Sequence, residues 1–209
     1  MIVKSKADAA ILNYQTNLAG STRWGLANQT LYDLCGQYPN HTDADEIVAK
    51  LWLIGRSYAA AIERRKNAEG YIGDFYYDTV APVMISAGQD LDSKIALLNS
   101  SKSIDDLLDT HAYLMRIFNS LTGMDKRSLA SKYLHFHCPE AVFIYDSVAS
   151  TALRKMVKKP KNIGVYLTGN RDAEYVDFCL RAIELRQYIA TQHGLNLTVR
   201  ELDTLLLNA

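Results

Sequence analysis

The helical spacing of apolar residues most constrains this chain, because it runs through nearly all of the 209 residues. Apolar side chains recur every three or four positions, for example over residues 104–121, and this spacing places them on one face of an α-helix. Residues 141–145 are the one β-like run, and a single strand has nothing to pair with. The sequence therefore predicts an all-α fold of about ten helices, with residues 141–145 as an extended connection.

Capping and breaking residues divide the pattern into separate helices. Thr42-Asp-Ala-Asp45 has the form of a capping box and opens a helix that bends at Gly55 and resumes as far as residue 65. Ser103 and Thr198 have the same relation to the acidic residues three positions later. The other predicted helices are 4–18, 23–37, 74–86, 88–98, 104–121, 126–136, 147–157 and 171–193, with loops at 67–73 and 159–170.

Composition indicates one intracellular domain. No proline- or glycine-rich linker divides residues 1–209, so we expect a single all-α domain. No apolar run approaches a membrane span, and the first residues lack the apolar core of a secretory signal. The three cysteines are far apart, which suits free thiols in a reducing compartment. We therefore expect a cytoplasmic monomer without a membrane partner.

The charge of the chain is zero in total but uneven along the sequence. Residues 122–165 hold eight basic and three acidic residues, a net charge of +5, whereas the segments on either side are net negative. Clustered basic side chains suit a phosphate backbone. A solvated lysine-rich loop at the end of a helix explains the same residues, because cations are favourable near a helix C-terminus. Both interpretations stay open on charge alone.

Asp146 is the candidate catalytic residue. It follows the apolar residues 142–145 and precedes a predicted helix, so it stands at an N-cap position. A carboxylate there accepts backbone N–H bonds and stays ionised beside the positive end of the helix dipole. The alternative is that Asp146 is only a cap, since aspartate is a preferred N-cap residue.

The order of elements around Asp146 resembles the helix–hairpin–helix DNA glycosylase superfamily. Leu121-Thr-Gly-Met-Asp125 is similar to the family's hairpin, residues 128–134 to the helix after it, and residues 139–148 to the segment that carries the catalytic aspartate. Asp125 replaces the second hairpin glycine, and the proline before the aspartate is missing. The resemblance implies two helical lobes around a cleft, with the hairpin and catalytic segment at about 104–159.

The resemblance also implies the chemistry. Asp146 would stabilise the positive charge that develops on the deoxyribose as the N-glycosidic bond breaks. Members with lyase activity carry a nucleophilic lysine in or after the hairpin, where this chain has Lys126 and Lys132. Lys132 is thus a second catalytic candidate, although we favour both as surface lysines that bind phosphate. The cysteines that bind an iron–sulfur cluster in some members are absent, and no cofactor is expected.

The expected partner is double-stranded DNA that contains modified bases. A base turned out of the duplex needs a pocket with aromatic walls and polar groups. Positions i and i+2 do not share a helix face, so the two nearby histidines are not expected to bind a metal. The candidates for substrate contacts are Tyr145, His135, His137, Arg56 and Tyr58. Those for the DNA backbone are Lys126, Arg127, Lys155, Lys158 and Lys159.

Three functions follow from these patterns. The leading hypothesis is a monofunctional DNA glycosylase, and residues 131–137 with 144–147 are similar to a divergent branch of bacterial anti-phage glycosylases. The resemblance to that branch implies glucosylated hydroxymethylcytosine of phage DNA as the substrate. The second hypothesis is a non-catalytic helical nucleic-acid-binding module. The third is an enzyme acting on a small molecule or RNA through Asp146 with His135 or His137.

Overall fold

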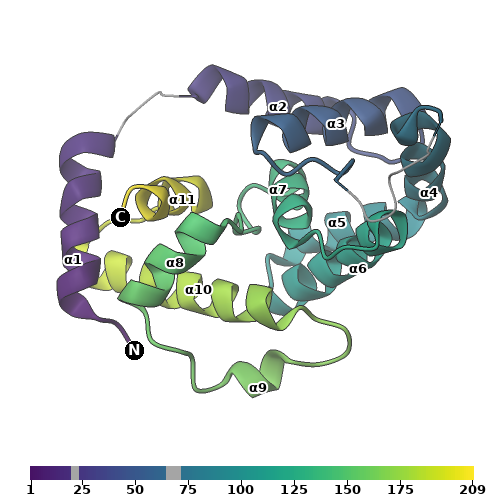
Figure 1. Ribbon diagram of the computed structural model, residues 1–209. Helices are drawn as coiled ribbons and strands as arrows, with labels where there is room; N and C mark the ends of the chain where they lie inside the picture. Colours follow the sequence, from purple (N-terminus) through teal and green to yellow (C-terminus); the bar gives the residue numbers. More distant parts are fainter. Residues whose placement is uncertain (20–23, 65–71) are drawn as a thin grey trace. The chain divides into compact units, whose positions relative to one another are not determined.

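The computed structural model describes residues 1–19, 24–64 and 72–209, and within them it is all-α (Figure 1). The described residues contain no strand, which confirms the predicted fold class. None of their helices is long and apolar enough to cross a membrane. The elements are α1 (Lys4–Asn13), the π-helical turn η1 (Tyr14–Leu18), α2 (Gly25–Gln37), α3 (Ala44–Ser57), the π-helical turn η2 (Tyr76–Val80), α4 (Ala81–Ser86), α5 (Gly88–Ser101), α6 (Ile104–Thr122), α7 (Arg127–His137), α8 (Ser147–Met156), α9 (Ile163–Tyr166), α10 (Ala173–His193) and α11 (Val199–Leu207).

The structure corrects the prediction around α3. Asp43, not Thr42, caps this helix, and its carboxylate accepts the N–H groups of Asp45 at 2.9 Å and Glu46 at 3.1 Å. The helix ends at Ser57 instead of continuing to residue 65. Ala59 has a φ of 51°, a left-handed conformation that ends a right-handed helix. Residue 65 and the predicted loop at 67–71 lie outside the described residues, as does residue 23.

Other boundaries agree with the sequence or differ slightly. Ser103 caps α6 and Thr198 forms a reciprocal capping box with Glu201, as predicted. The loop predicted at 159–170 contains the short helix α9. The helix predicted over 74–86 changes from the π-helical turn η2 to α4 next to Pro82, which occupies the first turn of α4. Proline is tolerated there because the first N–H groups of a helix have no partner within it.

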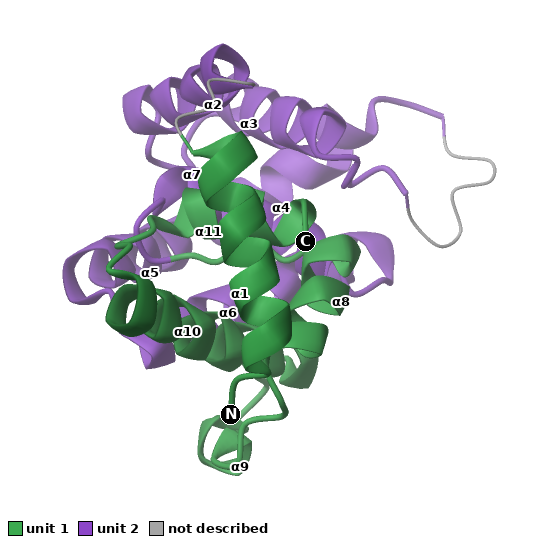
Figure 2. Ribbon diagram, turned by 90° about the vertical axis from the view of Figure 1, so that its left-hand side faces the viewer, with its two compact units in different colours: residues 1–23, 142–209 green, residues 24–141 purple. Residues whose placement is uncertain are grey.

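The chain divides into two compact units (Figure 2). Unit 1 comprises residues 1–23 and 142–209, and unit 2 comprises residues 24–141. The boundary between residues 141 and 142 therefore falls inside the segment 104–159 that resembles the glycosylases. Lys126, Lys132 and the two histidines of α7 belong to unit 2, whereas Asp146 belongs to unit 1.

Helix α7 forms the centre of unit 2. It packs against α2, α3 and α6, and residues 129–136 are all buried. A helix buried on every side lies in a core, and its polar residues therefore need partners within the protein. This burial explains why the polar side chains of α7 make the hydrogen bonds described below.

Helix α8 holds unit 1 together, because it contacts α1, α10 and α11. Its buried face consists mainly of small and aliphatic residues, among them Ala149, Ala152 and Leu153. An isolated antiparallel bridge between Ile2 and Val157 joins the start of the chain to the end of α8. The two sequence segments that make up unit 1 are thus side by side at this place.

Candidate active site

Asp146 occupies the N-cap of α8, as the sequence predicted. Its backbone is extended, and its carboxylate accepts the N–H of Val148 at 2.8 Å. The residue is half-buried, whereas Ser147 and Val148 after it are exposed. A carboxylate so placed is fixed in orientation, lies beside the positive end of the helix dipole and still reaches solvent.

The apolar residues before Asp146 anchor it. Residues 142–145 are all buried and have no helical or strand pairing. The hydroxyl of Tyr175 donates to the carbonyl of Phe143 at 2.8 Å, and the hydroxyl of Tyr145 donates to Glu174. The ring of Tyr145 packs edge-on against Phe178 at 5.2 Å between centroids. Tyr145 is therefore buried, and its contacts with Glu174 and Phe178 fix the backbone just before Asp146.

Five exposed lysines of unit 1 gather at the far end of α8 from Asp146. Lys155, Lys158 and Lys159 are exposed. The N–H of Val3 donates to Met156 O at 2.7 Å, and the N–H of Lys158 donates to Met1 O at 3.0 Å. These bonds bring the exposed Lys4 and Lys6 beside that end of α8. We call Lys4, Lys6, Lys155, Lys158 and Lys159 the basic end of unit 1.

Sequence reasoning missed Lys4 and Lys6, because they lie in a net-negative part of the chain. Only the bridge between the two chain segments places them with the predicted DNA-binding lysines. Arg154, by contrast, is paired with Glu174 at 3.2 Å and lies 3.9 Å from Asp177. Its charge is therefore largely compensated within unit 1.

The hairpin-like turn lies in unit 2 between α6 and α7. Gly123 ends α6 with a φ of 65°, a left-handed conformation that glycine adopts at little cost. Asp125, which stands in place of the second hairpin glycine, accepts a hydrogen bond from the side chain of Asn119 at 3.0 Å. Arg127 begins α7 and is half-buried, and its carbonyl lies 3.2 Å from His111 Nε2. A helix, a glycine turn and a second helix thus occur in the predicted order.

The interpretation of Lys126 and Lys132 as surface lysines is wrong. Both are buried, at 9% and 3% exposure. Lys126 donates to the carbonyls of Ala61, at 3.2 Å, and Arg64, and burial lowers the pKa of its ammonium. Lys132 donates to the carbonyl of Tyr58 at 3.2 Å and to Ser128 Oγ at 2.9 Å. The two lysines tie α7 to the irregular segment 58–64, whose carbonyls lack helical partners.

Arg56 and Tyr58 lie close to each other in sequence but have different partners. Arg56 is exposed and forms an ion pair with Glu63. The hydroxyl of Tyr58 donates to Asn28 Oδ1 at 2.7 Å, and Lys132 Nζ lies 5.7 Å from the centroid of the Tyr58 ring. The structure therefore brings Tyr58 and Lys132 together, whereas Arg56 faces Glu63.

The two histidines of α7 contact different neighbours, as their i and i+2 spacing requires. His135 is fully buried, and its Nε2 lies 2.7 Å from the hydroxyl of Tyr32. The ring of His137 packs against those of His41 at 5.3 Å and Tyr133 at 5.0 Å. Burial lowers the pKa of His137 well below its usual value. His137 Nε2 has no hydrogen-bond partner in the described part of the chain.

A buried polar chain in unit 2 was not foreseen from the sequence. Asp92 Oδ1 lies 2.5 Å from His41 Nδ1, and His41 Nε2 lies 2.8 Å from the hydroxyl of Tyr133. Burial and the nearby Lys50 lower the pKa of His41 to about 4, although Asp92 acts in the opposite direction. A neutral His41 fits both contacts, because Nδ1–H then donates to Asp92 and Nε2 accepts from Tyr133.

Lys50 completes this buried region. It is fully buried and donates to the carbonyls of Tyr38 at 2.7 Å and Asn40 at 2.9 Å. Desolvation lowers the pKa of its ammonium. The chain from Asp92 to Lys50 draws on residues from three separate elements and the loop before α3, so no local spacing could have revealed it. In the described residues, no three His, Cys, Asp or Glu side chains are grouped in a way that could hold a metal ion.

Comparisons with protein-family models, with curated proteins and with solved structures found no match to this chain.

Proposed function

We propose that this protein is a monofunctional DNA glycosylase that removes a modified base from double-stranded DNA and leaves an abasic site. The observation that carries the proposal is the position of Asp146, a half-buried, backbone-anchored carboxylate at the start of α8. It follows the helix–turn–helix of α6, Gly123 and α7 in the order that the glycosylase superfamily uses. The two lobes around a cleft that the resemblance implies are part of this proposal.

The chemistry requires one fixed negative charge. As the bond between C1′ and the base nitrogen breaks, the sugar acquires oxocarbenium character, and the Asp146 carboxylate stabilises it. A water molecule then adds to C1′ and gives up one proton, while the departing base is protonated. Because the Val148 N–H fixes the carboxylate before the reaction, little reorganisation is needed in the transition state.

The partners of the two lysines support hydrolysis without strand cleavage. A lyase lysine must reach C1′ as a neutral nucleophile. Lys132 and Lys126 instead donate to protein oxygens in the interior of unit 2. We therefore propose that neither forms a covalent bond with the sugar, and that borohydride treatment traps no complex between the wild-type enzyme and DNA.

The proposed substrate is a modified base such as glucosylated hydroxymethylcytosine of phage DNA. The sequence resemblance to the anti-phage branch supports this choice. The exposed lysines of the basic end, Lys155, Lys158 and Lys159, are proposed to contact the phosphate backbone. The proposed enzyme acts as a cytoplasmic monomer without a cofactor.

The test is Asp146→Asn, assayed on duplexes that contain cytosine, hydroxymethylcytosine, glucosylated hydroxymethylcytosine, uracil or an alkylated purine. Abasic sites are detected by alkaline cleavage. Base release should fall by about 100-fold or more, because the electrostatic contribution is lost. Folding should persist, since asparagine is as good an N-cap as aspartate.

Asp172→Asn is the matched control. Asp172 caps α10 in the same unit and accepts the N–H of Tyr175 at 2.7 Å. This variant should retain base release within about twofold, because the cap is conserved and the chemistry is not located there. If Asp146→Asn forms abasic sites at the wild-type rate, the proposed mechanism fails.

The alternative is a non-catalytic nucleic-acid-binding module. The hydrogen bond from Val148 to Asp146 favours it, because a plain N-cap makes the same contact. Under this alternative, the wild-type protein binds duplex DNA through the basic end but releases no base from any duplex in the panel.

A further inference from the structure

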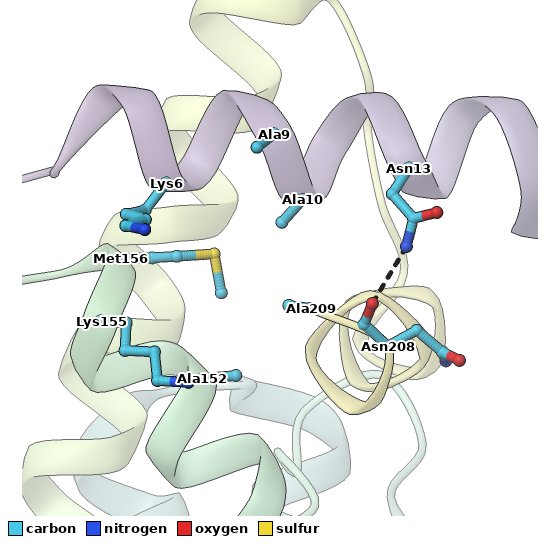
Figure 3. Close-up of a pocket in the computed structure, with 9 residues that line it drawn as sticks. All are labelled: Lys6, Ala9, Ala10, Asn13, Ala152, Lys155, Met156, Asn208 and Ala209. Atoms are coloured by element: carbon cyan, nitrogen blue, oxygen red, sulfur yellow. Dashed lines mark hydrogen bonds between the residues drawn. The ribbon is translucent and has the colours of Figure 1, made fainter.

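A pocket in unit 1 lies between α1, the second half of α8 and the residues after α11 (Figure 3). Its volume is about 270 Å³, just below the ~300–1,000 Å³ usual for ligand sites. Figure 3 shows alanines of α1 facing α8, with Met156 between them and the hydrogen bond from Asn13 to the Asn208 carbonyl at one end. The lining residues are Lys6, Ala9, Ala10, Asn13, Ala152, Lys155, Met156, Asn208 and Ala209.

The lining chemistry combines two cations with an apolar surface. Lys6 comes from α1 and Lys155 from α8, and both are exposed. No acidic side chain is among the described residues that line the pocket. Neither lysine forms a salt bridge in the described part of the chain. Ala10, Ala152 and Met156 are buried and supply a floor of methyl groups and a thioether.

The nearest acidic residue of α1 is occupied elsewhere. Asp8 lies two positions after Lys6, but its carboxylate accepts the hydroxyl of Tyr188 at 2.7 Å and lies 3.0 Å from His193 Nε2. These partners lower the pKa of Asp8 and keep its charge with α10. Asp8 is also absent from the residues that line the pocket, so it does not cancel the two ammonium charges there.

The helix dipoles do not supply positive charge at this place. The lining residues of α1 run from Lys6 to Asn13, along most of that helix, and the pocket also lies at the ends of α8 and α11, each of which carries about −0.5 charge. The α8 carbonyl of Met156 is moreover paired with the N–H of Val3. Positive charge at the pocket therefore comes from the side chains of Lys6 and Lys155, the charged side chains among the described residues that line it.

We propose that this pocket binds a small organic phosphate monoester, with the phosphate between Lys6 and Lys155 and its organic part over Ala9, Ala10 and Met156. Charge selects this class, because a monoester carries about −1.5 to −2 at pH 7 and matches two ammonium groups. A carboxylate or a phosphodiester carries only one negative charge. The apolar floor selects an organic body over free phosphate, and the Met156 sulfur suits an aromatic ring.

This site is separate from Asp146, although it shares Lys155 with the proposed contacts to the DNA backbone. Asp146 caps the first turn of α8, whereas Ala152, Lys155 and Met156 lie in its last two turns. The pocket residues of α8 lie six to ten positions after Asp146, a rise of roughly 9–15 Å. The pocket can thus hold its ligand whether or not Asp146 is catalytic.

The test uses phenyl phosphate as the probe, with titrations followed by backbone amide NMR of the full chain. Benzoate, phenol, inorganic phosphate and a short duplex DNA are the comparison ligands. Phenyl phosphate should shift the amides of Ala9, Ala10, Asn13 and Ala152, and bind about tenfold more tightly than benzoate or inorganic phosphate. Its affinity should rise between pH 5 and pH 7.5, because the second phosphate pKa is about 6.

Two single variants and one control locate the site. Lys6→Gln and Lys155→Gln should each weaken phenyl phosphate binding by about three- to tenfold. Lys161→Gln is the control, since this exposed lysine does not line the pocket. The proposal fails if phenol binds as well as phenyl phosphate, if Lys161→Gln has the same effect, or if only duplex DNA shifts these amides. The last outcome would show that the pocket binds the phosphodiesters of the DNA backbone instead of a phosphate monoester.

Discussion

Three lysines of unit 2 differ from the lysines at the basic end of unit 1 in a way that the sequence does not show. In unit 2, Lys50, Lys126 and Lys132 are buried and donate to protein oxygens, mainly backbone carbonyls. In unit 1, the lysines of the basic end are exposed. Buried lysines have acceptors that the fold fixes, and their removal leaves those acceptors unpaired. Exposed lysines are available to a ligand, so the comparison separates structural cations from binding cations.

The largest effect is expected from the most buried lysine. Lys50→Ala should lower the free energy of unfolding by about 3 kcal/mol, because it removes two hydrogen bonds and leaves a cavity. Lys50→Met keeps the stem and should cost about half as much. Chemical denaturation measures both effects. Lys155→Ala is the exposed control and should stay within about 0.5 kcal/mol. An equal loss in Lys50→Ala and Lys155→Ala would remove the distinction between these buried and exposed lysines.

A somewhat smaller loss is expected at Lys132. Lys132→Met should lower the free energy of unfolding by about 2 kcal/mol, since the Tyr58 carbonyl and Ser128 lose their donor. Hydrogen exchange should rise first at residues 58–64, which this lysine and Lys126 hold against α7. If Lys132→Met leaves stability unchanged but abolishes base release, Lys132 acts in the chemistry and not in the fold.

Acid should destabilise unit 2 through its buried histidines. Burial lowers the pKa of His41 to about 4 and that of His137 well below its usual value. Both stay neutral in the folded state, whereas the unfolded chain binds protons below about pH 6.5. Their contribution is therefore complete above that pH and declines towards pH 4, by about 1 kcal/mol per pH unit for each histidine. His137→Phe should flatten the pH dependence of stability between pH 6.5 and 5 without lowering stability at pH 5.

The groups facing His41 make this pH effect specific to the buried region. They are Asp92, Tyr133, His137 and Lys50, and protonation of His41 would place a second cation near the Lys50 ammonium. The Tyr133 hydroxyl would also lose its acceptor. A stability curve in which His137→Phe changes nothing would show that this histidine is not buried in its neutral form.

The smallest effect is expected from single contacts of the basic end with DNA. Replacing Lys158 and Lys159 by Gln should reduce the slope of log affinity against log salt by about 2, because each phosphate contact contributes ~0.9. Fluorescence anisotropy with a duplex measures the slope. Lys126→Met should leave it unchanged, since that ammonium is bonded to the carbonyls of Ala61 and Arg64. A reduced slope for Lys126→Met would show that the Lys126 ammonium contacts a DNA phosphate.

Local sequence was sufficient where a feature depends on neighbours along the chain. The caps at Ser103, Asp146 and Thr198 were predictable, because an N-cap bonds to N–H groups two or three residues later. The helical spacing likewise gave the helices and the all-α class. The end of α3 was not predicted, because no glycine or proline marks the left-handed Ala59, and the segment after it is bonded to Lys126 and Lys132, which lie far along the chain.

The sequence by itself determined the helices, the cap position of Asp146 and the charge of residues 122–165. Only the tertiary structure decided which of those charges are exposed: burial in unit 2 engages Lys126 and Lys132, while the bridge from Ile2 to Val157 adds Lys4 and Lys6 to Lys155. The physical reason is the distance along the sequence over which each kind of interaction acts. Helix formation and capping involve residues within four positions of one another, whereas burial and the grouping of charges depend on contacts between segments that the sequence does not bring together.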